Sequence, residues 1–313
     1  MFVSPSINVQ SKQQSDNING ILWALLAAVL FSSVAAMAKI AVVEFHVLQI
    51  LFFRQVIVFG SSLPSIKKSF PQSLKTSHPQ IHLLRLMGAF VALSCGIWSV
   101  AVLPLTTAIT LAFAQVFFVA ILAMLFLKEA VGVHRLSAVF VGFIGVIIVM
   151  RPGVEGLSNS YALIPIAGAL GAAVAVTSVR KLAATETTAT LLVYQALFVG
   201  ALAGVPLYWV WVTPDLAGLS LLLAMGLLST AGQWVGVRAL RLGEASVVGP
   251  MEYSKLIYAA ILGFVLFSEV PDEFTITGAV IIITSSIYIF RREVKTNQVK
   301  GQGRMTVPEN ENR

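Results

Sequence analysis

The chain has 313 residues, of which 57% are hydrophobic and only 11% are charged. Soluble domains have about 25% charged residues, so this composition excludes an ordinary soluble protein and predicts one embedded in a lipid bilayer. The net charge of +7 does not indicate nucleic acid binding, because the basic residues stand at the ends of apolar runs rather than on one solvated face.

Ten apolar stretches follow one another along the chain, and a helix needs about 20 apolar residues to cross a bilayer. The predicted spans are residues 21–40, 45–63, 83–103, 106–127, 134–150, 161–179, 188–212, 219–240, 245–267 and 276–290. Only short connections separate them, so the sequence predicts an all-α membrane protein with ten transmembrane helices. The polar tails, residues 1–20 and 292–313, are expected to be disordered.

Lysine and arginine residues are distributed unevenly between the two sides of this predicted bundle. Seventeen of the 21 lie in the tails and in the connections next to even-numbered spans, whereas only Lys39 and Arg151 lie on the other side. The remaining two, Arg54 and Lys255, lie inside spans. Connections rich in basic residues stay in the cytoplasm, so both termini are expected to be cytoplasmic.

The sequence contains an internal repeat. A shift of 140 positions places residues 120–129 over residues 260–269 without a gap, and places Arg151 over Arg291. The chain therefore divides into two five-span halves, residues 21–151 and 161–291. Because five is an odd number, the second half inserts upside down relative to the first, as in transporters that expose a central site alternately to each side.

Three charged residues are expected inside the membrane: Lys255 and Glu252 in the ninth span, and Arg54 in the second. A charge at the bilayer centre costs at least about 2.5 kcal/mol, so such groups usually face a cavity or a partner. Lys255 either attracts a carboxylate or phosphate of a substrate, or pairs with Glu252, or extends to the membrane surface. Glu252 either relays protons or neutralises a neighbouring cation. Arg54 either contacts the substrate or ties helix ends together.

Neutral polar and aromatic side chains provide further candidates for substrate contact. A mixed aromatic and hydrogen-bonding lining suits an organic metabolite better than a bare ion. Each of these side chains could serve helix packing instead. The candidates are Trp98 in the third span, Gln115 in the fourth, Gln233 and Trp234 in the eighth, and Tyr258 in the ninth.

Three other patterns are expected to be structural. Two GxxxG patterns, residues 200–204 and 232–236, allow close helix packing, either within the chain or between two copies in a homodimer. Glu129 and Glu269 stand at span ends, where they are expected to act as caps or gates. His78 and His82 flank a basic connection and are expected to be solvated.

The ordered set of motifs resembles the EamA family of the drug/metabolite transporter superfamily across nearly the whole chain. The resemblance implies a ten-helix bacterial carrier of the inner membrane, with a central cavity lined by spans one, three, four, six, eight and nine. Residues 252–255 and 271–278 resemble the branch that contains uptake carriers for S-adenosylmethionine and riboflavin. The matching features are Arg54, Arg85, Leu103-Pro104, residues 126–129, residues 267–269 and Pro271.

The leading hypothesis is a secondary transporter that moves a small polar organic metabolite by alternating access. The excess of cations within the spans favours an anionic or zwitterionic substrate, such as one that resembles an amino acid, nucleoside or vitamin. The single cysteine, Cys95, and four histidines form no disulfide or metal-ligand spacing, and no cofactor or catalytic residue is predicted. A membrane enzyme and a non-transporting receptor or scaffold are the alternatives from other classes.

Overall fold

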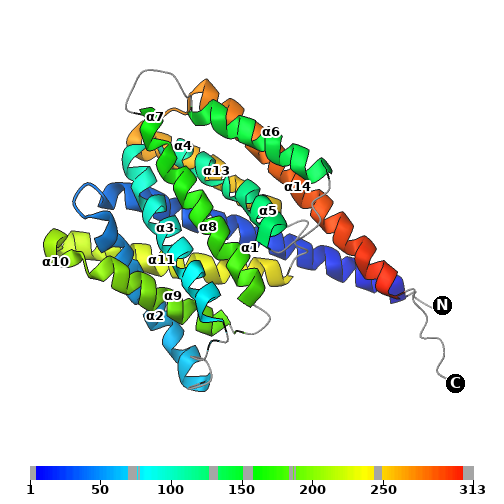
Figure 1. The fold of residues 1–313 in the computed structure, drawn as a ribbon, viewed down its shortest axis with the longest axis horizontal. Helices are drawn as coiled ribbons and strands as arrows, with labels where there is room; N and C mark the ends of the chain where they lie inside the picture. Colours follow the sequence, from blue (N-terminus) through cyan, green and yellow to red (C-terminus); the bar gives the residue numbers. More distant parts are fainter. Residues whose placement is uncertain are drawn as a thin grey trace.

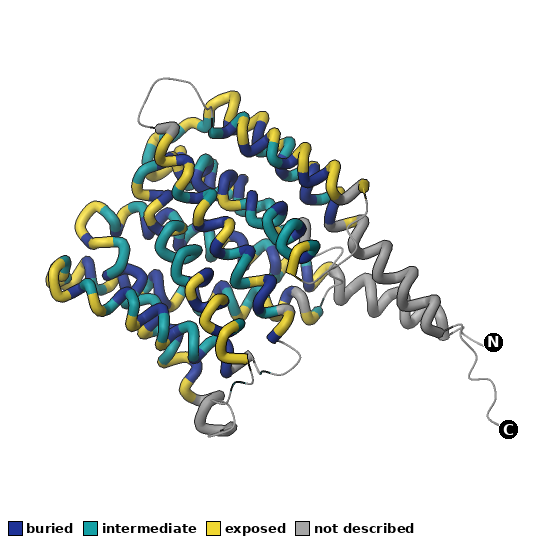
Figure 2. Tube along the Cα trace, viewed as in Figure 1, coloured by how far each residue is buried: buried dark blue, intermediate teal, exposed yellow. Residues whose placement is uncertain are grey.

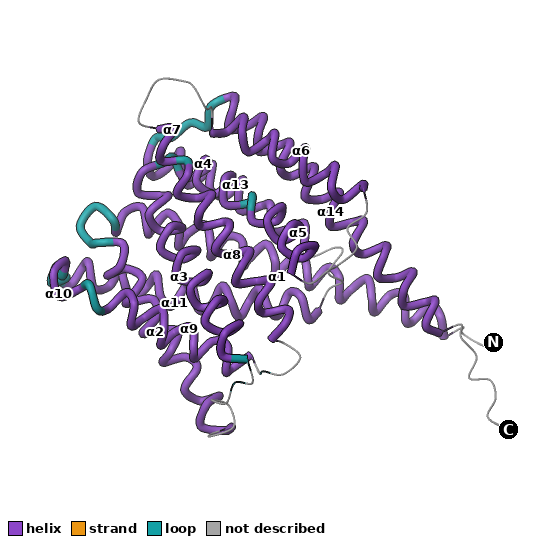
Figure 3. The backbone as a smooth tube through the Cα atoms, in the orientation of Figure 1, coloured by secondary structure: helices purple, strands orange, loops and turns teal. Residues whose placement is uncertain are grey.

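The computed structural model describes residues 5–69, 76, 78–126, 133–150, 158–182, 186, 188–242 and 249–305. Every regular element within these ranges is a helix, and short loops join the helices (Figure 3). Glu129 and Arg151, which the sequence analysis named, lie outside these ranges.

Within the described ranges, the first half of the chain forms six helical segments. They are α1 (Pro5–Ala41), α2 (Val47–Ser69), α3 (Pro79–Val102), α4 (Leu105–Ala112), α5 (Gln115–Phe126) and α6 (Val133–Met150). The predicted fourth span is divided here into α4 and α5. Helix α1 also includes residues 5–20, for which the polar composition predicts disorder.

The second half repeats this pattern with two additional short segments, α7 and α10. Its elements are α7 (Ser158–Tyr161), α8 (Leu163–Leu182), α9 (Thr188–Gly204), α10 (Leu207–Val210), α11 (Leu216–Leu242), the 3-10 helix η2 (Gly249–Tyr253), α13 (Ser254–Phe267) and α14 (Glu273–Met305). The predicted ninth span is divided into η2 and α13. Helix α14 continues through residues 292–305 of the predicted C-terminal tail, and its far end lies at the same end of the molecule as the start of α1 (Figure 1).

Four helical stretches are long and apolar enough to cross a membrane by themselves: residues 18–41, 79–102, 105–126 and 216–239. Five shorter apolar helices accompany them, at residues 47–63, 136–150, 163–179, 190–204 and 273–289. Together with the interrupted span of η2 and α13, these correspond to the ten predicted spans. The all-α membrane fold is therefore confirmed.

The helix contacts have the two-fold pattern that the internal repeat predicts. Helix α3 packs along α8, and its repeat equivalent α11 packs along α1. Helix α5 likewise packs on α8 as α13 packs on α1, while α2 pairs with α9 and α6 with α14. Figure 1 shows α6 and α14 side by side at one edge, and α2 and α9 at the opposite edge. The two halves thus exchange equivalent contacts, as inverted repeats do.

The outer faces of the bundle are apolar. Large apolar side chains such as Phe140, Phe264 and Ile276 are exposed. Buried positions concentrate where helices face one another (Figure 2). An exposed apolar surface of this extent is unfavourable in water and suits the hydrocarbon of a bilayer.

Both GxxxG patterns pack inside the chain. A Cβ at Gly204 would lie 3.1 Å from the ring of Phe52 on α2, and a Cβ at Gly232 would lie 3.3 Å from the ring of Phe31 on α1. These glycines therefore accommodate large side chains from neighbouring helices of the same chain. The second use that the sequence analysis considered, a homodimer contact, is not needed to explain either pattern.

Helices α3 and α8 cross with their backbones in contact. A Cβ on Gly88 would lie 2.7 Å from the carbonyl oxygen of Gly171, and a Cβ on Gly171 would lie 2.8 Å from the carbonyl oxygen of Gly88. Neither backbone can move aside independently, so only glycine fits at both positions.

We expect Gly88→Ala to lower the free energy of unfolding by about 1–3 kcal/mol, because the methyl group overpacks this crossing. Gly96 on the same helix is the matched control, since a Cβ there would have nothing within 4 Å. Gly96→Ala should be neutral or stabilise the helix by up to about 1 kcal/mol. Thermal unfolding in detergent measures both effects, and equal effects of the two substitutions would contradict the crossing described here.

Candidate functional site

The fourth span is interrupted at its centre. After α4 ends at Ala112, the amides of Phe113 and Ala114 donate to the carbonyls of Thr110 and Leu111, three residues back rather than four. This tight turn separates α4 from α5, which begins at Gln115. A 3-10 turn within a helix often marks a functional hinge, and interrupted helices border the substrate sites of repeat-built transporters.

The ninth span is interrupted at the equivalent place in the second repeat. The 3-10 helix η2 ends at Tyr253, and α13 begins at Ser254. The 140-residue shift places Phe113 over Tyr253 and Gln115 over Lys255. Phe113 has φ −65° and ψ −13°, and Tyr253 has φ −67° and ψ −16°, so the two backbones also turn alike.

The two interruptions meet. The rings of Phe113 and Tyr253 lie 5.0 Å apart between centroids, with their planes inclined by 40°. Because these residues are repeat equivalents, their contact lies close to the pseudo-two-fold axis that relates the halves. This position is where inverted-repeat carriers place their substrates. Neither residue was predicted as a site residue from the sequence, although the repeat shift and their aromatic character could have indicated them.

Lys255 and Glu252 flank this aromatic pair. The Lys255 Nζ atom lies 3.2 Å from the Glu252 Oε1 atom and 5.0 Å from the centroid of the Phe31 ring on α1. The Lys255 side chain is 22% exposed, whereas that of Glu252 is 64% exposed. The ammonium group is thus held between a carboxylate and an aromatic face. The Ser32 hydroxyl donates to the Lys255 carbonyl oxygen at 3.2 Å and ties α1 to this turn.

The structure brings two more predicted residues near the interruptions. Gln115 is the first residue of α5, and Tyr258 lies one turn beyond Lys255 on α13; both are partly buried. Arg54 lies apart, on α2. Its Nε atom is buried and, in the part of the chain that the structure describes, has no hydrogen-bond partner.

The other predicted residues lie on α3 and α11. Trp98 is 49% exposed on α3, and Trp234 is 72% exposed on α11, where its neighbour Gln233 is partly buried. A role for any of these residues in substrate contact stays a prediction. A groove of about 500 Å³ lies elsewhere, between the apolar side chains of α2 and α9.

A polar cluster closes one end of the bundle around Lys39 and Glu269. Lys39, in the last turn of α1, forms an ion pair with Glu269 and donates to the Leu103 carbonyl oxygen at 2.8 Å. The Leu105 amide donates to the other Glu269 carboxylate oxygen at 2.8 Å. The side chains of Lys39 and Glu269 are only 17% and 21% exposed. The cluster therefore joins α1, the α3–α4 connection and the end of α13.

Local structure explains why these groups meet. Leu103-Pro104 interrupts the chain between α3 and α4, which leaves the Leu103 carbonyl and the Leu105 amide free to bond side chains. Ser268 adopts the left-handed conformation with φ 54° at the end of α13, and this turn directs Glu269 back toward the Gly263 carbonyl. Glu269 was expected to be a cap or gate, but Lys39 was counted only as a connection charge.

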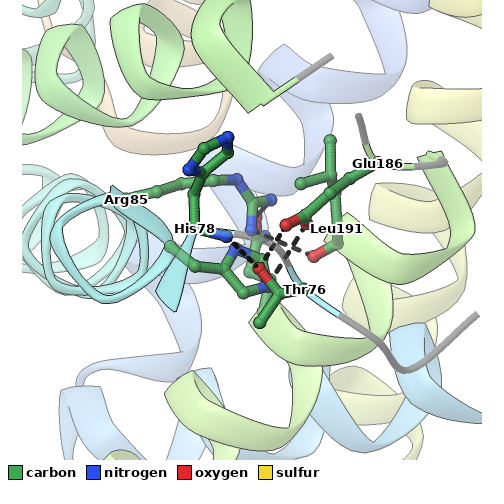
Figure 4. Close-up of polar contacts among 7 residues, drawn as sticks. Thr76, His78, Arg85, Glu186 and Leu191 are labelled. Carbon is green, nitrogen blue, oxygen red and sulfur yellow. Dashed lines mark hydrogen bonds and ion pairs between the residues drawn. The ribbon is translucent and has the colours of Figure 1, made fainter. Parts of the chain in front are cut away.

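A second polar cluster lies at the opposite end, where α3 and α9 begin and α8 has ended. Arg85 donates from its two terminal nitrogens to the Leu191 carbonyl oxygen and to Gln195 Oε1, both at 3.1 Å. Thr76 donates to Glu186, and Figure 4 shows these groups gathered between the helices. Arg85, a residue only 4% exposed, thereby ties α3 to α9 through its guanidinium.

His82 corrects one expectation. It lies 2% exposed inside this second cluster, with its ring 4.4 Å from that of Tyr194, rather than in solvent. His78 lies just before α3, at its N-cap position, and is exposed, whereas His82 lies in the first turn of the helix and is buried. The expectation that both histidines are solvated is therefore right for His78 and wrong for His82.

Comparison with known proteins agrees with this architecture. The model of the EamA-like transporter family matches residues 18–151 and 159–291, that is, once for each repeat. The chain therefore belongs to the EamA-like transporter family, whose members are membrane proteins. A solved structure with 15% identity superposes with a TM-score of 0.59, covering 88% of this chain and 99% of the other, which supports the fold.

Three relatives extend over most of the chain. The S-adenosylmethionine uptake transporter of Rickettsia prowazekii is 30% identical over 284 residues, covering 90% of this chain and 96% of the relative. The riboflavin transporter of Vibrio cholerae is 29% identical, with coverage of 90% and 96%. The pseudopaline exporter of Pseudomonas aeruginosa is 30% identical, with coverage of 87% and 96%. The chain is accordingly a transporter of a small metabolite across a membrane.

Proposed function

We propose that this transporter binds a zwitterionic metabolite that carries an aromatic ring system, at the junction of the two interrupted spans. The observation that supports this proposal is the arrangement of Lys255, Glu252 and the Phe113–Tyr253 pair. Lys255 supplies a cation for a carboxylate, and the half-exposed Glu252 carboxylate supplies an anion for an ammonium or sulfonium group. The two aromatic rings provide a surface on which a planar base can stack.

S-adenosylmethionine has all of these groups: a carboxylate, an ammonium, a sulfonium and an adenine ring. The relative from Rickettsia prowazekii is named as its uptake transporter. Riboflavin offers a planar ring system but neither an ammonium nor a carboxylate, so it would form no ion pair with Lys255 or Glu252. The charged pair therefore favours S-adenosylmethionine or a related amino-acid derivative over riboflavin.

We propose that the transporter lies in the inner membrane of a bacterial cell, with both termini in the cytoplasm. The uneven distribution of lysine and arginine supports this orientation. The end closed by Lys39 and Glu269 then faces the periplasm, and the end that contains Arg85 and His82 faces the cytoplasm. Substrate would pass each end in turn as the cluster there separates.

The substrate class predicts a specific pattern of competition. Proteoliposomes that contain the purified protein should accumulate radiolabelled S-adenosylmethionine, and excess S-adenosylhomocysteine, which keeps the amino-acid group and the adenine, should reduce this uptake. Adenosine, which lacks the amino-acid group, and riboflavin should compete at least about tenfold less well, since neither carries groups that pair with the charges of Lys255 and Glu252. Equal inhibition by riboflavin and S-adenosylhomocysteine would contradict recognition through the charged pair.

A further inference from the structure

We propose that Phe31 of α1 is a positioning residue of the substrate site, and that its ring holds the Lys255 ammonium where a substrate carboxylate can reach it. This role rests on the proposed function, because it concerns the cation of the same site. The Lys255 Nζ atom lies 5.0 Å from the centroid of the Phe31 ring. An aromatic face attracts a cation within about 6 Å of its centroid, so the two groups interact at this distance.

Two consecutive residues of α1 hold Lys255 at both of its ends. The Ser32 hydroxyl donates to the backbone carbonyl oxygen of Lys255 at 3.2 Å, and the ring of Phe31 meets the ammonium at the tip of the side chain. A lysine side chain has a flexible four-carbon stem, so an ammonium without such contacts samples many positions. Fixing the ammonium before the substrate arrives reduces the entropy that binding must offset.

An aromatic ring can hold the ammonium without taking the place of the substrate. An ammonium group has three N–H donors, and Glu252 Oε1 accepts one of them at 3.2 Å. The ring face attracts the ammonium through its quadrupole and carries no net charge. It therefore does not neutralise Lys255, as a second carboxylate would, and an N–H donor stays available for the substrate carboxylate.

Gly232 of α11 provides the space for the ring. A Cβ at Gly232 would lie 3.3, 3.3 and 3.4 Å from the Cε1, Cζ and Cε2 atoms of Phe31. Because these three distances are nearly equal, the glycine lies over the face of the ring and not beyond its edge. Contacts with Gly232 on α11 and with Lys255 on α13 thus restrain the ring.

The equivalent helix crossing in the other repeat forms without an aromatic residue. The 140-residue shift places Phe31 over Gly171 and Ala92 over Gly232. A Cβ on Gly171 would lie 3.0 Å from the Ala92 amide nitrogen, so this pair meets as Phe31 and Gly232 do. The glycine belongs to α8 in one crossing and to α11 in the other. Helix packing therefore does not dictate a large side chain at residue 31.

The residues that contact Lys255 are replaced together in the other repeat. Where Gln115 takes the place of Lys255, the equivalents of its three partners cannot form these contacts. Phe31, Ser32 and Glu252 correspond to Gly171, Ala172 and Ala112. The aromatic ring, the hydroxyl and the carboxylate thus accompany the cation, which favours a role in holding it over a role in helix packing alone.

The contact is tested without any substrate. 4-Fluorophenylalanine replaces Phe31, and its ¹⁹F signal is recorded in nanodiscs. Lys255→Met should shift this signal, because removing the ammonium changes the electric field at the ring. Lys181→Met, which removes an exposed lysine of α8, should leave the signal unchanged. A signal that is indifferent to Lys255→Met would overturn the proposal.

The positioning role is tested with phenylalanines that carry one, two or three fluorines in place of Phe31. Each fluorine withdraws electron density from the ring face and weakens its attraction for a cation, while the shape of the ring changes little. The KM for S-adenosylmethionine uptake into proteoliposomes should rise stepwise, to about fivefold for the trifluorinated ring, with an unchanged maximal rate. In a Lys255→Met background, the same series should leave KM unchanged.

The outcomes separate this role of Phe31 from the proposed function. A KM that stays constant along the series, in a protein that transports S-adenosylmethionine, would overturn the positioning role alone. A rise of equal size in both backgrounds would also overturn it, since the bulk of the fluorines would then be responsible. If the parent protein took up no S-adenosylmethionine, the proposed substrate would be wrong, and this role of Phe31 would fall with it.

Discussion

Glu269→Gln is expected to increase, by about 30-fold, the rate at which an impermeant maleimide added from the periplasmic side labels a cysteine reporter. The reporter is Ser254→Cys at the second interruption, in a Cys95→Ser background that removes the native thiol. Glu269→Gln keeps an acceptor for the Leu105 amide but removes the ion pair with Lys39, both side chains of which are mostly buried. Leaving a buried cation without its counter-ion costs about 2 kcal/mol or more, and each 1.4 kcal/mol is a factor of ten in an equilibrium. The substitution destabilises only the state in which Lys39 and Glu269 meet, so the fraction of molecules open to the periplasm should increase.

Two further variants separate the ion pair from general damage. Glu44→Gln removes an exposed carboxylate just beyond the end of α1 and should leave the reaction rate unchanged. The double substitution Lys39→Glu with Glu269→Lys restores opposite charges but places a carboxylate beside the Leu103 carbonyl. It should therefore restore closure only in part. If Glu269→Gln left the periplasmic labelling rate unchanged, the cluster around Lys39 and Glu269 would not be the periplasmic gate.

Lys255→Met is expected to lower S-adenosylmethionine uptake by about 10- to 100-fold at low substrate concentration. The substitution preserves the length and apolar stem of the side chain but removes the cation, and a hydrogen bond to a charged group is worth about 1.5–3 kcal/mol. The loss should appear mainly as a raised KM, because the interaction already exists with bound substrate. Initial rates in proteoliposomes over a range of concentrations measure this effect.

The double variant Lys255→Met with Glu252→Gln distinguishes substrate binding from simple neutralisation. The two side chains lie 3.2 Å apart, so a lysine that only neutralised Glu252 would become dispensable once the carboxylate was removed. We expect the double variant to transport no better than Lys255→Met, because both contacts with the zwitterion are lost. Recovery to the parental rate would remove Lys255 and Glu252 from the substrate site.

The repeat made much of the architecture predictable. Ten apolar runs and an odd number of spans in each half predict the helix count and the two-fold pattern of contacts. What hydropathy did not reveal is the pair of interruptions at Phe113 and Tyr253, because a short 3-10 turn leaves the apolar composition of a span unchanged. Comparing the two repeats position by position, rather than averaging over a span, would have brought these two aromatic residues together.

Side-chain contacts between segments distant in sequence could not be predicted from the sequence. Lys39 is separated from Glu269 by 230 positions, and nothing local to either residue indicates the other. His82 belongs by sequence to a basic connection, yet its helix turns it toward Tyr194 and Glu186 rather than toward solvent. The sequence locates the charged residues at the ends of spans, whereas the packing of the helices determines which residue each of them pairs with.

We propose that the two interrupted spans form one substrate site, which opens alternately to each side of the membrane. The most direct measurement compares maleimide labelling of the Ser254→Cys reporter in right-side-out and inside-out vesicles, with and without S-adenosylmethionine. We predict that the thiol reacts from both sides and that the substrate slows both reactions. A thiol that reacts from only one side in every variant and condition, or from neither, would contradict alternating access at this site.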